Sequence, residues 1–133
     1  MSVVLVDTSV WIDYLRKPTS TTKDILDKLM DDDNVCTCYT VQYELFPYLK
    51  NEDQFLKFHL LFSRIPLISE NDLDWPGLMH TAFLLKRKGI SGFGLGDAII
   101  AHLAAQHNKV VFTLDGDFKN LAKAMTIRLL DFD

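Results

Sequence analysis

Residues 3–9 read Val-Val-Leu-Val-Asp-Thr-Ser, an apolar run that passes directly into polar residues. The continuous apolar and β-branched half, residues 3–6, is typical of a strand buried on both faces. The polar half offers side chains that cap the start of a helix. A buried strand that leads at once into a helix is expected in a parallel α/β sheet.

The rest of the chain repeats this alternation of strand and helix. Further strands are predicted at residues 35–39, 66–68, 109–113 and 127–130. Helices are predicted at residues 10–16, 21–33, 41–50, 52–63, 71–88, 97–107 and 116–125. Such alternation places helices on both faces of a parallel sheet. The sequence therefore predicts an α/β fold, a three-layer α/β/α domain with a mainly parallel sheet of about five strands.

Proline and glycine set the expected helix ends. Pro47 is expected to kink or split the helix at 41–50, and Pro76 fits only in the opening turn of the helix at 71–88. Gly89 suits the C′ position after this second helix, whose last turn is basic.

The composition fits one globular domain over residues 1–133. Of the 133 residues, 48% are hydrophobic and 24% are charged, which excludes a disordered chain. No apolar run approaches the roughly 20 residues of a membrane span, and no secretory signal is recognisable. Cys36 and Cys38 alternate on a predicted strand, so we expect one to face the core and the other to face outward, without a disulfide. A reducing cytoplasm is the expected location.

Four acidic residues fall next to the predicted carboxyl ends of strands. Asp7 and Asp115 follow two strands, and Glu44 and Asp97 lie in the first turns of two helices. In open parallel sheets the ligand crevice lies outside these strand ends, so we expect the four carboxylates at one edge. Asp117 is a candidate fifth, although taken alone it is better explained as a turn or cap residue.

Carboxylates gathered at one edge repel one another unless a cation balances them. The net charge of −4 counts against nucleic-acid binding by bulk positive charge, and no nearby basic residue obviously neutralises these acids. Oxygen ligands indicate Mg²⁺ or Mn²⁺ and not zinc. Such a site suits phosphodiester hydrolysis, because a bound metal lowers the pKa of the attacking water. Each acid alone is explained as a cap or strand end, and the metal site depends on their convergence.

Four short motifs follow one another along the chain. They are Val-Asp-Thr-Ser-Val-Trp-Ile-Asp-Tyr-Leu-Arg at 6–16, Thr-Val-Gln-Tyr-Glu-Leu at 40–45, Gly-Asp-Ala-Ile-Ile-Ala at 96–101 and Thr-Leu-Asp-Gly-Asp-Phe at 113–118. In this order and spacing they resemble the PIN-domain ribonucleases, and within that family the VapC-type toxins of bacterial and archaeal toxin–antitoxin systems. The resemblance covers nearly the whole chain.

The resemblance implies roles for particular residues. The four metal-site acids of the family match Asp7, Glu44, Asp97 and Asp115. The more variable fifth acid of the family matches Asp117. Hydroxyl residues that support such a site by hydrogen bonding match Thr8 or Ser9, and Thr113.

The resemblance also implies an activity and partners. It implies a Mg²⁺-dependent endoribonuclease, with Mn²⁺ as a substitute, that cuts transfer or ribosomal RNA and stops translation. Typical relatives are homodimers, silenced by a VapB-type antitoxin whose C-terminal tail covers the active-site groove. Trp11, Tyr14 and Tyr48 are candidates to line such a groove, whereas Leu15 and Phe46 are better explained as core residues.

Some features depart from the family pattern or remain open. Relatives usually carry a small residue at the position of His102, which we expect to be half-exposed or helix-packed and to point away from Asp97. The glycine loop at 92–96 is another variable piece, whose length can alter substrate access. Four cations follow acid-bearing segments and are candidate RNA contacts, with solvated helix ends as the alternative: Arg16, Lys17, Lys119 and Lys123.

Three other kinds of protein are alternatives to the ribonuclease. A receiver-like regulatory domain shares the parallel sheet and an acidic pocket, but Asp7 has no acidic neighbour and only Arg128 stands where a lysine is needed. A PIN-like domain kept as a binding scaffold is the related alternative, although all four acids are present. A flap-nuclease-like DNA enzyme needs helical clamps for which 133 residues leave no room.

Overall fold

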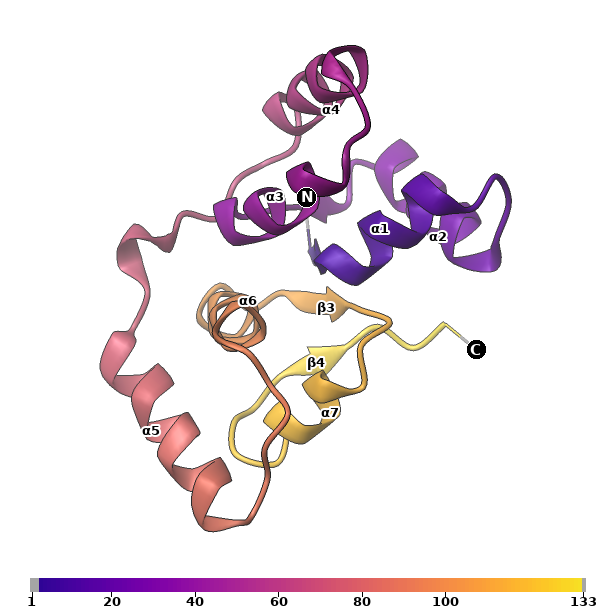
Figure 1. Ribbon diagram of the computed structural model, residues 1–133. Coiled ribbons are helices and arrows are strands. Elements are labelled where there is room, and N and C mark those ends of the chain that lie inside the picture. The colour runs from indigo at the N-terminus through magenta and orange to yellow at the C-terminus, as the bar shows by residue number, and fades with distance from the viewer. Residues whose placement is uncertain (1–2, 133) are drawn as a thin grey trace.

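A parallel sheet forms the centre of the protein, as seen in a computed structural model that describes residues 3–132 (Figure 1). Within those residues the sheet has four strands in the order β2-β1-β3-β4. They are β1 (Val4–Val6), β2 (Val35–Cys36), β3 (Val110–Phe112) and β4 (Arg128–Leu129). β1 is central, pairing with β2 on one side and β3 on the other, and all of its residues are buried.

The sequence predicts about five strands, and the strand expected at 66–68 is reduced to a single bridge. Thr37 pairs with Leu67 alone, through Thr37 N–H to Pro66 O at 2.9 Å and Ile68 N–H to Thr37 O at 2.8 Å. Pro66 has no backbone N–H to donate, which limits the ladder that can form here. The prediction of a parallel sheet flanked by helices is confirmed, with this small difference in strand number.

Seven α-helices and two 3₁₀-helices within residues 3–132 surround the sheet. The α-helices are α1 (Thr8–Arg16), α2 (Thr21–Asp31), α3 (Tyr39–Leu45), α4 (Glu52–Ser63), α5 (Trp75–Arg87), α6 (Leu95–Gln106) and α7 (Asp117–Leu121). The 3₁₀-helices are η1 (Phe46–Tyr48) and η2 (Glu70–Asp72). α1 packs on α2 and α3, and α3 packs on α6. In Figure 1, α4 at the top and α5 at the lower left lie on opposite sides of the α3–α6 pair.

The helix ends follow the proline and glycine positions. The helix expected at 41–50 is split into α3 and η1, and Pro47 lies in the opening turn of η1. The helix expected at 71–88 begins only at Trp75, where Pro76 occupies its opening turn. After α5, Gly89 adopts φ +74 and donates to Lys86 O, and Ile90 donates to Leu85 O. This Schellman motif confirms the predicted C′ glycine.

The two cysteines are both buried, so the prediction that one faces outward is wrong. Cys36 lies in β2 with its Sγ 3.4 Å from Val4 O, and Cys38 has already left the strand as the N-cap of α3. Alternation between faces therefore does not apply to this pair. Burial raises the pKa of Cys36 to about 11 and that of Cys38 to about 12.

The structure also decides the placement of Trp11 and His102. Trp11 is fully buried and packs edge-on against Phe62, with 4.9 Å between ring centroids. The prediction that Trp11 lines an exposed groove is therefore wrong. His102 is only 8% exposed and hydrogen-bonds with Thr81 Oγ1 at 3.1 Å. It therefore packs between α6 and α5, which is the second of its two predicted placements. Within the described residues, no helix has the length and apolar character to span a membrane.

Candidate functional site: a carboxylate pocket

The strand order creates a switch point between β1 and β3. From β1 the chain continues toward β2 on one side, and from β3 it continues toward β4 on the other. Asp7 follows β1 and donates its N–H to Phe112 O at 2.9 Å, which holds the two strand ends together. In sheets of this kind the crevice for a ligand opens at the carboxyl ends of such a strand pair.

Asp7 is the most deeply buried acid at this crevice, with 3% of its surface exposed. Its Oδ2 accepts hydrogen bonds from the hydroxyls of Ser9 at 2.7 Å and Thr113 at 2.8 Å. Ser9 Oγ also accepts the N–H of Leu114 at 3.0 Å, so the hydroxyls tie α1 to the segment after β3. Burial raises the pKa of Asp7, and the hydrogen bonds counteract only part of that rise.

Glu44 is positioned from the other side by α3 and α6. Thr8 Oγ1 donates to Glu44 Oε1 at 2.7 Å. A Cβ atom at Gly96 would collide with Glu44 Oε2, so only glycine at this position lets the carboxylate lie against the first turn of α6. The sequence alone did not decide whether Thr8 or Ser9 supports the acidic site. In the structure both do, because Thr8 hydrogen-bonds to Glu44 and Ser9 hydrogen-bonds to Asp7.

Three further carboxylates approach one another at the starts of α6 and α7. Asp97, Asp115 and Asp117 bring one oxygen each within 4.8 Å of the others. Asp117 donates its N–H to Asp115 Oδ1 at 2.9 Å, which fixes the turn that carries both. Burial, together with the charges of Asp7, Asp115 and Glu44, raises the pKa of Asp97 to about 6. Asp117 is therefore a turn residue, as the sequence predicts, and it also lies close to the other acids of the cluster.

A pocket of about 380 Å³ collects most of these groups, and we call it the carboxylate pocket. Its walls are Asp7, Thr8, Ser9, Ile12, Glu44, Tyr48, Asp97 and Asp115. Sequence reasoning did not assign Ile12 or Gly96 to the site, and it placed Tyr48 only in a wider groove. A glycine directly before Asp97 was the one available indication that something packs closely against this helix.

The donor set fits a hard divalent cation. All the charged groups of the cluster are carboxylates, and within residues 3–132 no lysine, arginine or histidine forms an ion pair with them. Mutual repulsion of this kind is relieved by a cation with oxygen ligands. Asp97, Asp115 and Asp117 are the best placed to hold it together, with Asp7 and Glu44 facing the same pocket.

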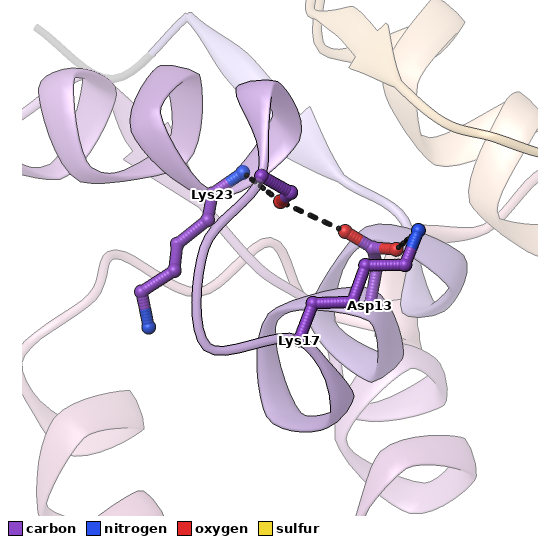
Figure 2. Close-up of polar contacts among 4 residues, drawn as sticks. Asp13, Lys17 and Lys23 are labelled. Carbon is purple, nitrogen blue, oxygen red and sulfur yellow. Dashed lines mark hydrogen bonds and ion pairs between the residues drawn. The ribbon is translucent and has the colours of Figure 1, made fainter.

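The candidate RNA-contacting cations are distributed unevenly. Lys17 Nζ is engaged by Asp13 at 2.8 Å, and Figure 2 shows this pair turned toward each other at the end of α1. The Arg16 guanidinium lies over the Tyr48 ring, 5.5 Å from its centroid. Lys119 lines a second pocket of about 450 Å³ that shares Asp115 with the first. Lys123 lines neither pocket.

Fold and site together define a parallel α/β domain with an acidic pocket at its switch point. The chain belongs to the PIN-domain family, whose model matches residues 4–124. It is similar to Ribonuclease VapC11 of Mycobacterium tuberculosis (strain H37Rv), with 21% identity covering 98% of this chain and 99% of that protein. VapC ribonuclease Mb1587 of Mycobacterium bovis has the same identity and coverage. The resemblance to VapC-type proteins is thereby confirmed.

Solved structures show the same fold. VapBC2 from Rickettsia felis, bound to a DNA fragment from its promoter, superposes with a TM-score of 0.78 at 20% identity, covering 98% of both chains. FitAcB from Neisseria gonorrhoeae superposes with a TM-score of 0.71 at 23% identity, covering 96% of both chains.

Proposed function

We propose that this protein is a divalent-metal-dependent endoribonuclease and the toxin of a toxin–antitoxin pair. The observation that carries the proposal is the convergence of Asp7, Glu44, Asp97 and Asp115 on one pocket that contains no cationic side chain. Similarity to proteins named VapC ribonuclease supports the same activity. Thr8, Ser9 and Thr113 hold two of these carboxylates, Glu44 and Asp7, in place by hydrogen bonds.

The proposed roles follow from the contacts. Asp97, Asp115 and Asp117 hold the cation, and Asp7 faces it with its carboxylate fixed by Ser9 and Thr113. When bound, Mg²⁺, or Mn²⁺ in its place, supplies a water of lowered pKa and neutralises the charge of the phosphate. The hydroxyl hydrogen bonds keep the oxygens oriented, because outer partners of this kind set the geometry of metal ligands.

The proposed partners are an RNA substrate and an antitoxin. The structures that share this fold include VapBC complexes, so we propose a VapB-type antitoxin that silences the enzyme in the cytoplasm. We further propose that the active form is a homodimer and that the substrate is a transfer or ribosomal RNA. These proposals rest on the family and not on a contact within this chain.

Cleavage of total cellular RNA by the purified, partner-free protein tests the function. The reactions contain Mg²⁺, Mn²⁺ or EDTA, and compare wild type with Asp7→Asn and with Asp53→Asn, an exposed acid on α4 as the matched control. We expect discrete fragments with wild type and Asp53→Asn, and none with EDTA or Asp7→Asn. Mapping the fragment ends then identifies the RNA and the cleaved bond.

Absence of cleavage by folded, metal-loaded protein would contradict the proposed activity. In that case, retained binding of the metal or of RNA would identify a PIN-like binding domain. Cleavage that persists in EDTA, or in Asp7→Asn, would show that a different chemistry is at work.

A further inference from the structure

Tyr48 is the one aromatic residue that lines the carboxylate pocket in the described part of the chain. It is the last residue of η1, and 51% of its surface is exposed. The neighbouring aromatic Phe46 is instead packed inward, edge-on to Phe55 with 5.3 Å between ring centroids. The structure therefore places the exposed Tyr48 ring beside the acids, whereas Phe46 is partly buried against the core.

The backbone under Tyr48 is well fixed. Pro47 restricts the first turn of η1, and Leu49 N–H closes that turn on Phe46 O at 3.0 Å. Phe46 anchors the turn through its contact with Phe62, 6.0 Å between centroids. A ring on a fixed backbone loses little conformational entropy when it contacts a ligand.

The side chain is also held by a cation. The guanidinium of Arg16, the last residue of α1, lies 5.5 Å from the Tyr48 ring centroid. Arg16 is exposed, and no carboxylate pairs with it within residues 3–132. It differs in this from its neighbour Lys17, which Asp13 neutralises. The rim of the acidic pocket thus carries an unpaired positive charge and an exposed π surface side by side.

We propose that Tyr48 and Arg16 form a nucleotide-binding subsite, in which Tyr48 stacks on one base next to the cleaved bond and Arg16 contacts that nucleotide's phosphate. The proposal rests on the ribonuclease function proposed above and specifies its substrate class. The carboxylates repel phosphate until a cation binds, so a neutral stacking contact provides affinity that the charge of the pocket does not oppose. Bases within an RNA helix already stack on one another, and therefore the subsite selects an unpaired nucleotide.

A double-mutant cycle between protein and RNA tests the proposal. The substrate is an RNA hairpin that carries the mapped cleavage site in its loop, with each flanking base replaced in turn by an abasic nucleotide. The proteins are wild type, Tyr48→Ala, Tyr48→Phe and Tyr43→Ala; the last is the matched control, an 83% exposed tyrosine on α3 that does not line the carboxylate pocket. Circular dichroism melts verify that all four are folded.

We expect Tyr48→Ala to lower kcat/KM roughly 5- to 150-fold, mainly through KM, as loss of one stacked base predicts. Tyr48→Phe and Tyr43→Ala remain close to wild type. One abasic position lowers kcat/KM for wild type by a similar factor and has no further effect on Tyr48→Ala. A hairpin in which the same segment is base-paired is cut poorly by wild type.

The proposal is overturned if every abasic position affects wild type and Tyr48→Ala equally, or if paired and unpaired segments are cut alike. Fluorescence anisotropy of a short labelled oligoadenylate in Mg²⁺, with the same samples analysed for cleavage, separates this failure from failure of the enzyme activity. Binding that depends on Tyr48 without any cleavage would retain the subsite and overturn the proposed function. Equal binding by wild type and Tyr48→Ala, or no binding at all, would overturn the subsite.

Discussion

Among single residues, Asp97 is needed in one protonation state for the proposed function and favoured in the other by the metal-free fold. The proposed function needs its ionised carboxylate, yet burial and the neighbouring acids raise its pKa to about 6 and so disfavour that form in the folded protein. A group with a raised acidic pKa binds a proton more readily when folded, so the metal-free protein gains stability as the pH falls toward that value. The proposed metal ligand Asp97 is therefore expected to destabilise the metal-free fold at neutral pH.

Replacement of Asp97 by Asn is expected to abolish cleavage and to stabilise the metal-free protein. The gain in unfolding free energy at about pH 7 should be roughly 1 kcal/mol, allowing for solvent screening of a half-buried group. The gain should shrink toward about pH 5, where the wild-type carboxyl is protonated. Urea denaturation in EDTA at both pH values measures it, with Asp53→Asn as the exposed control. A variant less stable than wild type at neutral pH would contradict the argument.

Gly96 is expected to matter for activity through Glu44. An added Cβ in Gly96→Ala collides with Glu44 Oε2 and displaces the carboxylate that Thr8 holds. A shift of about 1 Å in a positioned group can lower activity about 100-fold, and we expect a loss of that order. Gly116→Ala is the control, because a Cβ there meets no atom within 4 Å. Initial cleavage rates compare the two, and equal rates would remove the positioning role of Gly96.

Between helices, the contact of His102 with Thr81 joins α6 to α5 without an ion pair. Burial lowers the pKa of His102, and the nearby Asp74 charge opposes the shift only in part. A histidine whose pKa is lowered on folding contributes stability that is present above its unfolded value of 6.5 and is lost as the pH falls below that value. We therefore expect the packing of α5 on α6 to weaken at acidic pH.

This predicts a pH-dependent difference between wild type and His102→Gln. The stability advantage of wild type over the variant should decrease as the pH falls from about 7.5 to 5.5, because only wild type must protonate a buried imidazole. Thermal melts across this range measure it, with the exposed His107→Gln as the control. If the melting temperatures of wild type and His102→Gln changed with pH by the same amount, the prediction would be contradicted.

Some helix and strand boundaries can be predicted from the local sequence alone, and others cannot. Gly89 and Pro76 determine their helix ends by local backbone geometry, so both could be predicted. The strand at 66–68 could not, because a β-ladder depends on its neighbour and Pro66 offers no donor. Cys38 was misplaced for a similar reason, since the strand ends at Cys36.

Across the whole molecule, metal binding is expected to stabilise the fold. A cation that binds only the folded state at a hundred times its Kd adds about 2.7 kcal/mol. We therefore expect Mg²⁺ or Mn²⁺ to raise the melting temperature of EDTA-treated wild type. The same ions should have little effect on Asp97→Asn, which lacks one of the proposed ligands. Differential scanning fluorimetry measures both, and an equal shift in the two proteins would place the metal elsewhere.

The location of the acids was the most predictable property of the whole molecule. Parallel strands meet with their carboxyl ends at one edge, so Asp7 and Asp115 could be brought together from the sequence. The burial of Trp11 could not, because it depends on how helices pack on one another. Those packing contacts join residues far apart in the chain, so the local sequence pattern does not reveal them.

The order of the carboxylates along the chain has a consequence for protein synthesis. Asp7 is translated early, but its partners at Asp97, Asp115 and Asp117 follow only after several intervening helices. A nascent chain that has not yet extruded β3 and the turn into α7 holds an incomplete pocket. On the proposed function, such a chain cannot cut RNA while its own ribosome is still making the first half of the molecule, and each copy becomes active only after those late segments have emerged.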